Sequence, residues 1–193
     1  MKTLHNLYII AGCNGAGKTT ASYNLLPDIL DCREFVNADE IAKGLSPFQP
    51  ESVSIQAGRI MLKRINELIV QHKDFSIETT LTTRSYMRLI QRAKRAHYQV
   101  HLVYFWLESP ELAQERVKHR VENGGHNIPP ATIVRRYFAG IRNFINLFLP
   151  ICDYVSLINN SRLPAEMIIE KNVNEEEPRI INTETWQYIN NQI

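Results

Sequence analysis

Residues 12–19 read Gly12-Cys13-Asn14-Gly15-Ala16-Gly17-Lys18-Thr19, which matches the phosphate-loop pattern G-x-x-x-x-G-K-[S/T]. An apolar run at 7–11 precedes this segment, and a stretch with helical periodicity at 18–26 follows it. This is the strand–loop–helix setting that the pattern requires. A chance match has odds on the order of 1% in a chain of this length at average glycine usage. The segment therefore predicts an α/β fold organised around a P-loop.

Outward from this loop, apolar strands and periodic helices alternate. Strand-like runs lie at 35–37, 75–78, 100–107 and 154–158, and helix-period segments lie at 52–72, 85–96 and 110–122. The alternation predicts a P-loop NTPase of three α/β/α layers with a five-stranded, mostly parallel sheet. Runs at 167–171 and 179–182 then predict a small hairpin followed by a short helix within 163–193. We expect a single domain over 1–193.

The composition excludes several classes of protein. The chain has 193 residues, 44% hydrophobic and 22% charged, with a net charge of +2, as is typical of a globular domain. No apolar stretch approaches the roughly 20 residues that span a membrane. The N-terminal apolar run leads into a glycine loop rather than a cleavage site, so we expect a cytoplasmic protein without a signal peptide. Three cysteines without a C-x-x-C pair predict free thiols, and neither a disulfide framework nor a zinc site.

Charge is distributed unevenly along the chain. Residues 84–142 hold 11 Lys and Arg against 4 Asp and Glu, whereas residues 163–193 hold 2 against 6. The basic stretch is either a set of solvated helix faces or an anion site, most simply one for phosphate. Nucleic acid is the weaker candidate partner, because no RNA-binding or helix-turn-helix signature accompanies the basic residues.

The loop and the start of its helix carry the nucleotide chemistry. The glycines let backbone N–H groups surround phosphate oxygens, Lys18 reaches the β- and γ-phosphates, and the Thr19 hydroxyl ligates Mg²⁺. Positive surroundings could lower the pKa of the Cys13 thiol, although we favour a structural role for it. ATP and Mg²⁺ are the expected cofactors, with GTP left open. The expected nucleotide contacts are Gly12, Cys13, Asn14, Gly15, Ala16, Gly17, Lys18, Thr19 and Thr20.

Asp39 follows the second predicted strand. Because the carboxyl ends of parallel strands line one crevice, Asp39 and Lys18 should face the same cleft. Asp39 can there contact a substrate hydroxyl and take its proton as a general base. The alternative is that Asp39 caps a helix beginning at Glu40, and the two roles are compatible.

Glu78 and Thr80 stand at the end of the third predicted strand, in Glu78-Thr79-Thr80-Leu81. A carboxylate at this position can hold Mg²⁺ through water or can hydrogen-bond the substrate. Thr80 is a candidate for holding the substrate or its phosphate. The alternative is a polar strand end that satisfies local backbone donors.

The segment 116–136 has the pattern of a hinged lid. Arg116 and Arg120 are four residues apart on one helical face, Gly124-Gly125-His126 interrupts that helix, and Arg135-Arg136 lie on the next one. Arginines beside such a lid, at 124–130, can neutralise a transferring phosphoryl group while closure excludes water. The alternative is an ordinary surface loop between two amphipathic helices.

The ordered set of these motifs resembles the zeta toxins and zeta-toxin-like P-loop kinases over about residues 7–161. The resemblance rests on the loop at 12–19 together with Asn37-Ala38-Asp39, Glu78-Thr79-Thr80-Leu81, Gly124-Gly125-His126 and Arg135-Arg136-Tyr137. The sequence departs from the family in lacking the long C-terminal extension of the toxins. It also has Asn159-Asn160-Ser161 where shorter relatives tend to have Asp-Asn-Ser.

The resemblance implies an adenylate-kinase-like, ATP-dependent kinase. It assigns the catalytic base to Asp39, the nucleotide and Mg²⁺ to Lys18 and Thr19, and phosphate contacts to lid arginines. Mapped onto this chain, the lid arginines are Arg120 and Arg135 or Arg136. Arg120 and Arg136 are expected to be catalytic, together with Lys18 and Asp39, and Arg135 is expected to contact the substrate. Glu78 and Thr80 take the substrate role, and Glu78 with Thr19 the metal role. Toxin members of the family phosphorylate UDP-N-acetylglucosamine on a sugar hydroxyl.

These observations lead to a principal hypothesis and two alternatives. The principal one is an ATP/Mg²⁺-dependent kinase that phosphorylates a hydroxyl of a small molecule, such as a nucleotide sugar. The first alternative is a P-loop ATPase or nucleotide switch that acts through a protein partner, and the second is a nucleic-acid-end kinase. The sequence leaves open the acceptor, an antitoxin or other protein partner, and which of Arg116, Arg120, Arg135 and Arg136 contact phosphate.

Overall fold

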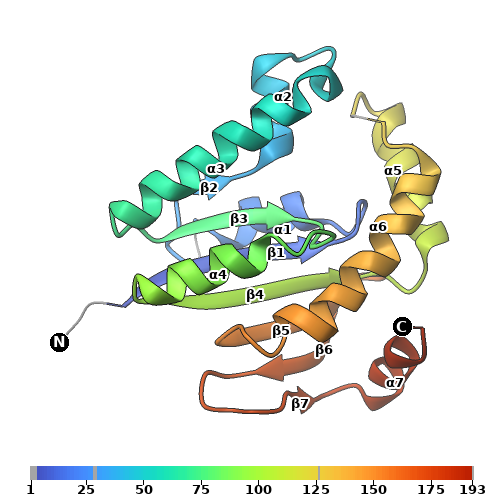
Figure 1. Cartoon of the computed structure of the whole chain (residues 1–193). Coiled ribbons are helices and arrows are strands. Elements are labelled where there is room, and N and C mark those ends of the chain that lie inside the picture. Colours follow the sequence, from blue (N-terminus) through green and yellow to red (C-terminus); the bar gives the residue numbers. More distant parts are fainter. Residues whose placement is uncertain (1–3, 28–29, 126, 193) are drawn as a thin grey trace.

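The computed structural model describes residues 4–27, 30–125 and 127–192, and within these residues one sheet of seven strands runs through the molecule (Figure 1). The strand order is β2-β3-β1-β4-β5-β6-β7. The strands are β1 (His5–Gly12), β2 (Phe35–Val36), β3 (Phe75–Thr79), β4 (Tyr98–Trp106), β5 (Tyr154–Asn159), β6 (Glu166–Lys171) and β7 (Arg179–Ile180).

The α/β prediction is confirmed, with one correction to the number of strands. Strands β1 to β5 pair with one another in parallel, as the alternating pattern predicts. The predicted C-terminal hairpin, β6 and β7, is antiparallel and pairs with β5 rather than standing apart. Ile168 and Ile169 of β6 are fully buried, so the hairpin extends the core and the sheet has seven strands instead of five.

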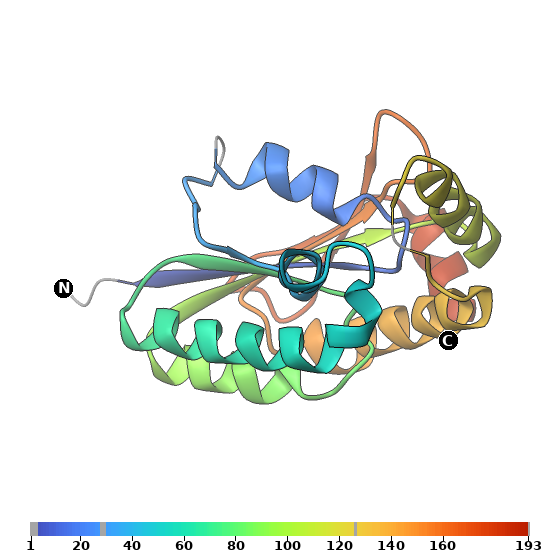
Figure 2. The ribbon, with the colours of Figure 1, turned by 90° about the horizontal axis from the view of Figure 1, so that it is seen from above.

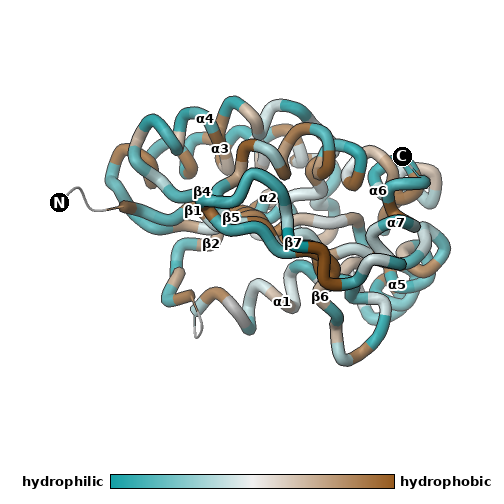
Figure 3. Tube along the Cα trace, turned by 90° about the horizontal axis from the view of Figure 1, so that it is seen from below, coloured by the Kyte–Doolittle hydropathy of each residue, from teal (hydrophilic) through white to brown (hydrophobic). Residues whose placement is uncertain are grey.

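Helices cover both faces of the sheet. Figures 2 and 3 show α1 on one side and α3 and α4 on the other, and the colours of α3 and α4 in Figure 3 alternate between hydrophilic and hydrophobic, as expected of helices with one buried face. The helices are α1 (Lys18–Leu25), α2 (Ala38–Leu45), the 3₁₀ turn η1 (Pro50–Val53), α3 (Ser54–Val70), α4 (Tyr86–Arg95), α5 (Pro110–Glu122), α6 (Pro130–Asn143), the π-helical turn η2 (Phe144–Phe148) and α7 (Thr183–Asn191).

Strand β1 separates two hydrophobic cores. Leu7 and Ile9 belong to the core that includes α3 and α4, whereas Tyr8 and Ile10 belong to the core that includes α5 and the start of α6. This follows from the period-two alternation of side chains along a strand. A central strand packed on both faces gives the loop that follows it a rigid base.

Two close contacts fix the loop and helix α6 at the carboxyl end of the sheet. A Cβ at Gly12 would collide with the carbonyl oxygen of Phe105, and its φ of 138° also favours glycine. A Cβ at Gly140 would lie 2.7 Å from the carbonyl oxygen of Thr80, so α6 packs directly on the segment after β3. Asn143 strengthens this contact by donating to the carbonyl oxygen of Leu81 at 2.8 Å.

Length and apolar character decide whether any of these helices could cross a membrane. None of those in the described residues combines the length and the apolar character needed to cross a bilayer.

Candidate functional site

The P-loop connects β1 to α1 and holds a buried lysine. Gly17 takes the left-handed conformation (φ 83°) directly before α1, which only glycine adopts easily. Lys18 is 7% exposed, and its Nζ donates to the carbonyl oxygen of Cys13 at 2.9 Å. The ammonium is therefore held across the mouth of the loop, where a phosphate group would meet it. Thr20, the last predicted nucleotide contact, is exposed in the first turn of α1.

Burial, rather than positive charge, dominates the environment of Cys13. Desolvation raises the pKa of its thiol to about 11, against the opposing effect of Lys18. The suggestion that the loop lowers this pKa is therefore wrong. Cys13 is a buried, protonated thiol that fills space beneath the loop, in line with the structural role favoured for it.

Glu78, at the end of β3, lies next to the start of α1. The Thr19 hydroxyl donates to its carboxylate, at 2.9 Å from Oε2, and Lys18 Nζ lies 3.8 Å from Oε1. The Glu78 side chain is only 8% exposed, and burial raises its pKa, opposed mainly by Lys18 and Thr19. The Glu78 carboxylate and the Thr19 hydroxyl therefore place two kinds of oxygen side by side. Mg²⁺ prefers oxygen ligands, so the two side chains are suited to hold it. No cluster of three His, Cys, Asp or Glu side chains suited to a metal occurs in the described part of the chain.

Asp39 lies in the first turn of α2, and its neighbour Asn37 caps that helix. The Asn37 Oδ1 accepts from the backbone N–H of Asp39 at 2.8 Å, and α2 begins at Ala38. The alternative in which Asp39 caps a helix starting at Glu40 is therefore wrong, because Asn37 already supplies the acceptor that the helix needs. Asp39 is exposed and lines two cavities.

The first cavity joins six of the predicted site residues, one of which is Asn14 of the P-loop. It measures about 150 Å³ and lies between the P-loop, the end of β3, the start of α2 and α6. Its lining includes Lys18, Asp39, Glu78, Thr80 and Arg136. The structure thus brings together side chains from four separate parts of the chain, at the carboxyl edge of the parallel strands.

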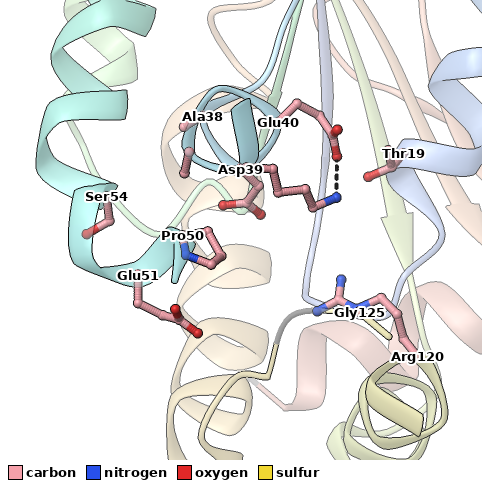
Figure 4. A pocket seen from close by; sticks show the side chains of 11 residues that line it. Thr19, Ala38, Asp39, Glu40, Pro50, Glu51, Ser54, Arg120 and Gly125 are labelled. Carbon is pink, nitrogen blue, oxygen red and sulfur yellow. Dashed lines mark hydrogen bonds and ion pairs between the residues drawn. The ribbon is translucent and has the colours of Figure 1, made fainter. Parts of the chain in front are cut away.

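The second cavity lies on the other side of Asp39 and also measures about 150 Å³ (Figure 4). Thr19 and Asp39 line one part of it, and Arg120 reaches in from α5. Lys43 also lines it and is paired with Glu40, at 2.6 Å between Nζ and Oε1. This cavity separates α2 and η1 from the turn after α5, which is the segment predicted to be a lid.

The four arginines of the segment 116–136 differ in their surroundings. Arg136 donates to Asn14 Oδ1 at 3.1 Å, and burial lowers its pKa, opposed by Asp39. Arg120 lines the second cavity, whereas Arg135 is exposed on α6. Arg116 donates to the backbone carbonyls of Asn160 and Ser161, at 2.9 and 2.8 Å. Of the lid residues at 124–130, His126 lies outside the described residues.

Sequence reasoning missed two asparagines that hold the site together. Asn37 Nδ2 donates to Glu78 Oε2 at 3.0 Å, and Asn160 Nδ2 donates to the carbonyl oxygen of Ala16, inside the P-loop, at 2.8 Å. Asn160 also stands against Gly17, where a Cβ would lie 2.7 Å from its Nδ2. Asn37 belongs to the motif Asn37-Ala38-Asp39 that carries the family resemblance, but no role of its own was predicted for it. The signal that could have found it is the N-cap preference of asparagine. Asn160 lies in Asn159-Asn160-Ser161, the segment in which the sequence differs from the Asp-Asn-Ser of shorter relatives, and no local pattern gave it a role.

Comparison with known proteins agrees with this arrangement. Residues 7–137 match the family described as AAA domain. An uncharacterized protein of Haemophilus influenzae is 34% identical over 127 residues, which is 65% of this chain and 88% of that protein.

Two solved structures share the fold at 17% sequence identity. The AvrRxo1-ORF1:ORF2 complex with ATP has a TM-score of 0.77 over 97% of this chain, which spans 64% of that chain's length. A structure of the PezAT chromosomal toxin–antitoxin system of Streptococcus pneumoniae has a TM-score of 0.65 and covers 100% of this chain and 86% of that one. Because the family match extends over more than half of the sequence and runs from β1 through the P-loop into α6, the chain belongs to the AAA domain family, with a P-loop kinase-like fold.

Proposed function

We propose that this protein is an ATP- and Mg²⁺-dependent kinase that transfers the γ-phosphoryl group to a hydroxyl of a small molecule. The observation that carries the proposal is the first cavity, whose wall combines the cations Lys18 and Arg136 with the carboxylates Asp39 and Glu78. Phosphoryl transfer needs fixed positive charge around the phosphates and an oxygen base near the attacking hydroxyl. A binding module or switch has no need for such a base.

The nucleotide is assigned to the P-loop, residues 12–19, with contacts extending to Thr20. Lys18, released from the Cys13 carbonyl, would reach the γ-phosphate, while the loop N–H groups and the N-terminus of α1 bind the β-phosphate. The AvrRxo1 complex was solved with ATP, which supports ATP as the nucleotide.

Mg²⁺ is assigned to Thr19 and Glu78. Their side chains already converge, with 2.9 Å between Thr19 Oγ1 and Glu78 Oε2, and the buried carboxylate favours a nearby cation. Thr19 and Glu78 would hold Mg²⁺ there, and the ion would supply positive charge that neutralises charge developing during transfer.

Asp39 is assigned as the general base. Its carboxylate takes the proton of the acceptor hydroxyl while the hydroxyl oxygen forms a bond to the γ-phosphorus, and the bond from that phosphorus to the bridging oxygen of ADP breaks. Arg136 stabilises the transferring group from α6. We assign Arg120 the same role from α5, with closure of a lid at 124–130, while Arg135 and Thr80 contact the substrate.

For the acceptor, we propose a nucleotide sugar, with UDP-N-acetylglucosamine as the first candidate. The support is the ordered resemblance to zeta-toxin-like kinases, together with a fold shared with the PezAT toxin–antitoxin system. The same two observations support an antitoxin-like protein partner. We place the reaction in the cytoplasm, where ATP and nucleotide sugars occur.

The test is phosphoryl transfer from γ-labelled ATP to a panel of small molecules that includes UDP-N-acetylglucosamine, with mass spectrometry of the product. We expect Asp39→Asn to keep ATP affinity but to lower the transfer rate by roughly 10²-fold or more, the usual scale for a positioned base. Asp31→Asn, at an exposed aspartate whose side chain is 92% accessible, is the matched control and should behave like the native protein.

Three outcomes would separate the hypotheses. Asp39-dependent phosphorylation of another small molecule would eliminate UDP-N-acetylglucosamine and keep the kinase mechanism. Transfer to the 5′-hydroxyl of an oligonucleotide, with binding that weakens steeply as salt rises, would favour the nucleic-acid-end kinase. ATP hydrolysis that is indifferent to Asp39 and to every acceptor would favour the ATPase or switch.

A further inference from the structure

Asn37 uses both ends of its side-chain amide inside the site. Its Oδ1 accepts from the Asp39 N–H at 2.8 Å, and its Nδ2 donates to Glu78 Oε2 at 3.0 Å. The residue is 6% exposed, so neither bond competes strongly with water. One rigid side chain thus connects the helix turn that carries Asp39 to the carboxylate at the end of β3.

Helix capping alone does not require asparagine at this position. A cap needs only an acceptor, which serine or aspartate supplies equally well. Asn182 shows the simple case, since its Oδ1 accepts from the Thr185 N–H at 2.9 Å at the start of α7. Donation from Nδ2 to Glu78 is the part of the arrangement that only an amide of this length provides.

The bond to Glu78 matters because that carboxylate is held by side chains from separate elements. Thr19, at the start of α1, donates to it, and Asn37 reaches it from the end of β2. The pairing of Val36 with Ile77 sets β2 beside β3 and so fixes the distance that the Asn37 amide spans. The carboxylate is therefore oriented by two donors before any ligand arrives.

We propose that Asn37 is a positioning residue that holds Glu78 in the orientation that receives Mg²⁺–nucleotide, in fixed register with the base Asp39. This role rests on the kinase function proposed above and extends it to a residue that acts through Glu78 and Asp39. Residues that orient metal ligands in this way typically contribute 10–100-fold in metal affinity or activity, so the order of magnitude is about tenfold or more.

The test compares Asn37→Ser and Asn37→Asp with the matched cap variant Asn182→Ser. Both Asn37 variants keep an acceptor for the Asp39 N–H. Asn37→Ser has no donor that reaches Glu78, and Asn37→Asp places a second carboxylate where the amide donated. ATP affinity is measured by titration calorimetry once with Mg²⁺ and once with EDTA, and thermal unfolding is recorded for each protein.

For both Asn37 variants, we expect ATP affinity in Mg²⁺ to fall about tenfold or more. In Asn37→Ser, which adds no charge, affinity in EDTA should stay unchanged. The turnover number should fall by a similar factor while KM for the acceptor stays near its native value. Melting temperatures should shift no more than that of Asn182→Ser, since all variants retain a capping acceptor.

Native Mg²⁺-dependent affinity and turnover in both Asn37 variants would overturn the proposal. Equal losses of ATP affinity in Mg²⁺ and in EDTA, with a melting temperature far below that of Asn182→Ser, would also overturn it and leave Asn37 as a structural cap. If the native protein binds ATP no better with Mg²⁺ than with EDTA, the Mg²⁺ role of Glu78 fails and the proposal with it. Failure of the kinase function is a separate outcome, seen as no phosphoryl transfer from labelled ATP by the native protein.

Discussion

Lys18 and Glu78 form a buried ion pair, in which the charge of each side chain is balanced by the other. Both side chains are 8% exposed, and Lys18 Nζ lies 3.8 Å from Glu78 Oε1. In such surroundings, a charge without a partner is costly. A phosphate that enters the loop would therefore meet a cation that is already desolvated and held in place, at little further cost of ordering.

At this residue scale, we predict that Lys18→Ala lowers ATP affinity by about tenfold or more and abolishes turnover, because the γ-phosphate loses a charge-assisted partner. Calorimetric titration with ATP and the labelled-ATP assay measure the two effects. Lys63→Ala, at an exposed position on α3, controls for the loss of a positive charge. Native affinity and activity in Lys18→Ala would refute the assignment of the loop.

The sequence located most of the individual site residues but not the contacts between them. The P-loop pattern and the rule that strand ends share one edge place Lys18, Asp39 and Glu78 at one cavity, as the structure shows. The bond from Asn37 to Glu78 depends on the pairing of β2 with β3, 41 residues apart in sequence. No local pattern encodes such a distance, so this contact could not be predicted.

At the scale of elements, the sequence predicts helices and strands well where hydrophobic periodicity is strong. It predicts less well where a helix begins and which strands form the edge of the sheet. Helix α5 has the predicted bounds, whereas the segment predicted at 52–72 divides into η1 and α3. The hairpin was predicted, but its attachment to β5 was not. Whether a C-terminal hairpin joins a sheet depends on burial of residues such as Ile168 against helices elsewhere in the chain, which the local pattern does not show.

Strand β4 carries a half-buried histidine, His101, that gives the fold a testable response to pH. The ring of His101 stacks on Tyr154, with 4.4 Å between centroids, and lies 4.8 Å from that of Tyr8. Its Nε2 is 3.1 Å from Asn6 Oδ1. Burial lowers the pKa of His101, opposed by Asp153 and Asp74. Protonation therefore favours the unfolded chain, in which the histidine keeps a pKa of about 6.5.

We accordingly predict that stability contributed by neutral His101 is lost as the pH falls below about 6.5 and that the loss levels off below the folded pKa. The melting temperature of the native protein should fall more than that of His101→Gln between about pH 7.5 and pH 5.5, because glutamine does not titrate. His119→Gln, at an exposed position on α5, is the matched control. Parallel pH profiles for the native protein and His101→Gln would contradict the prediction.

At the scale of the whole molecule, ligand binding and stability are linked. A nucleotide that binds the folded P-loop, and not the unfolded chain, stabilises the protein by about 2.7 kcal/mol at 100 times its Kd. For a domain of 193 residues, this corresponds to a rise in melting temperature of roughly 5–10 °C. We expect this rise for ATP with Mg²⁺ in the native protein and about half of it or less in Lys18→Ala, whose affinity is about tenfold or more lower, measured by thermal unfolding at matched ATP concentrations. An equal rise in both proteins would show that ATP binds elsewhere.

The overall architecture was accessible from the sequence because many weak signals agree. Alternating strands and helices, a P-loop after the first strand and a globular composition all indicate one α/β domain. The order in which β2, β3, β1 and β4 lie in the sheet is set by long-range packing, and composition or periodicity alone does not determine it.

Both outermost strands, β2 and β7, are only two residues long, Phe35–Val36 and Arg179–Ile180. An exposed long strand would offer a row of unpaired backbone groups onto which an extended peptide could add. These short borders give such a peptide little backbone to pair with, and Arg179 places a charge on one of them, paired with Glu170 at 2.6 Å. Growth of the sheet by strand addition at β2 or β7 would therefore gain only two residues of pairing at each border, too few to hold a peptide by backbone contacts alone.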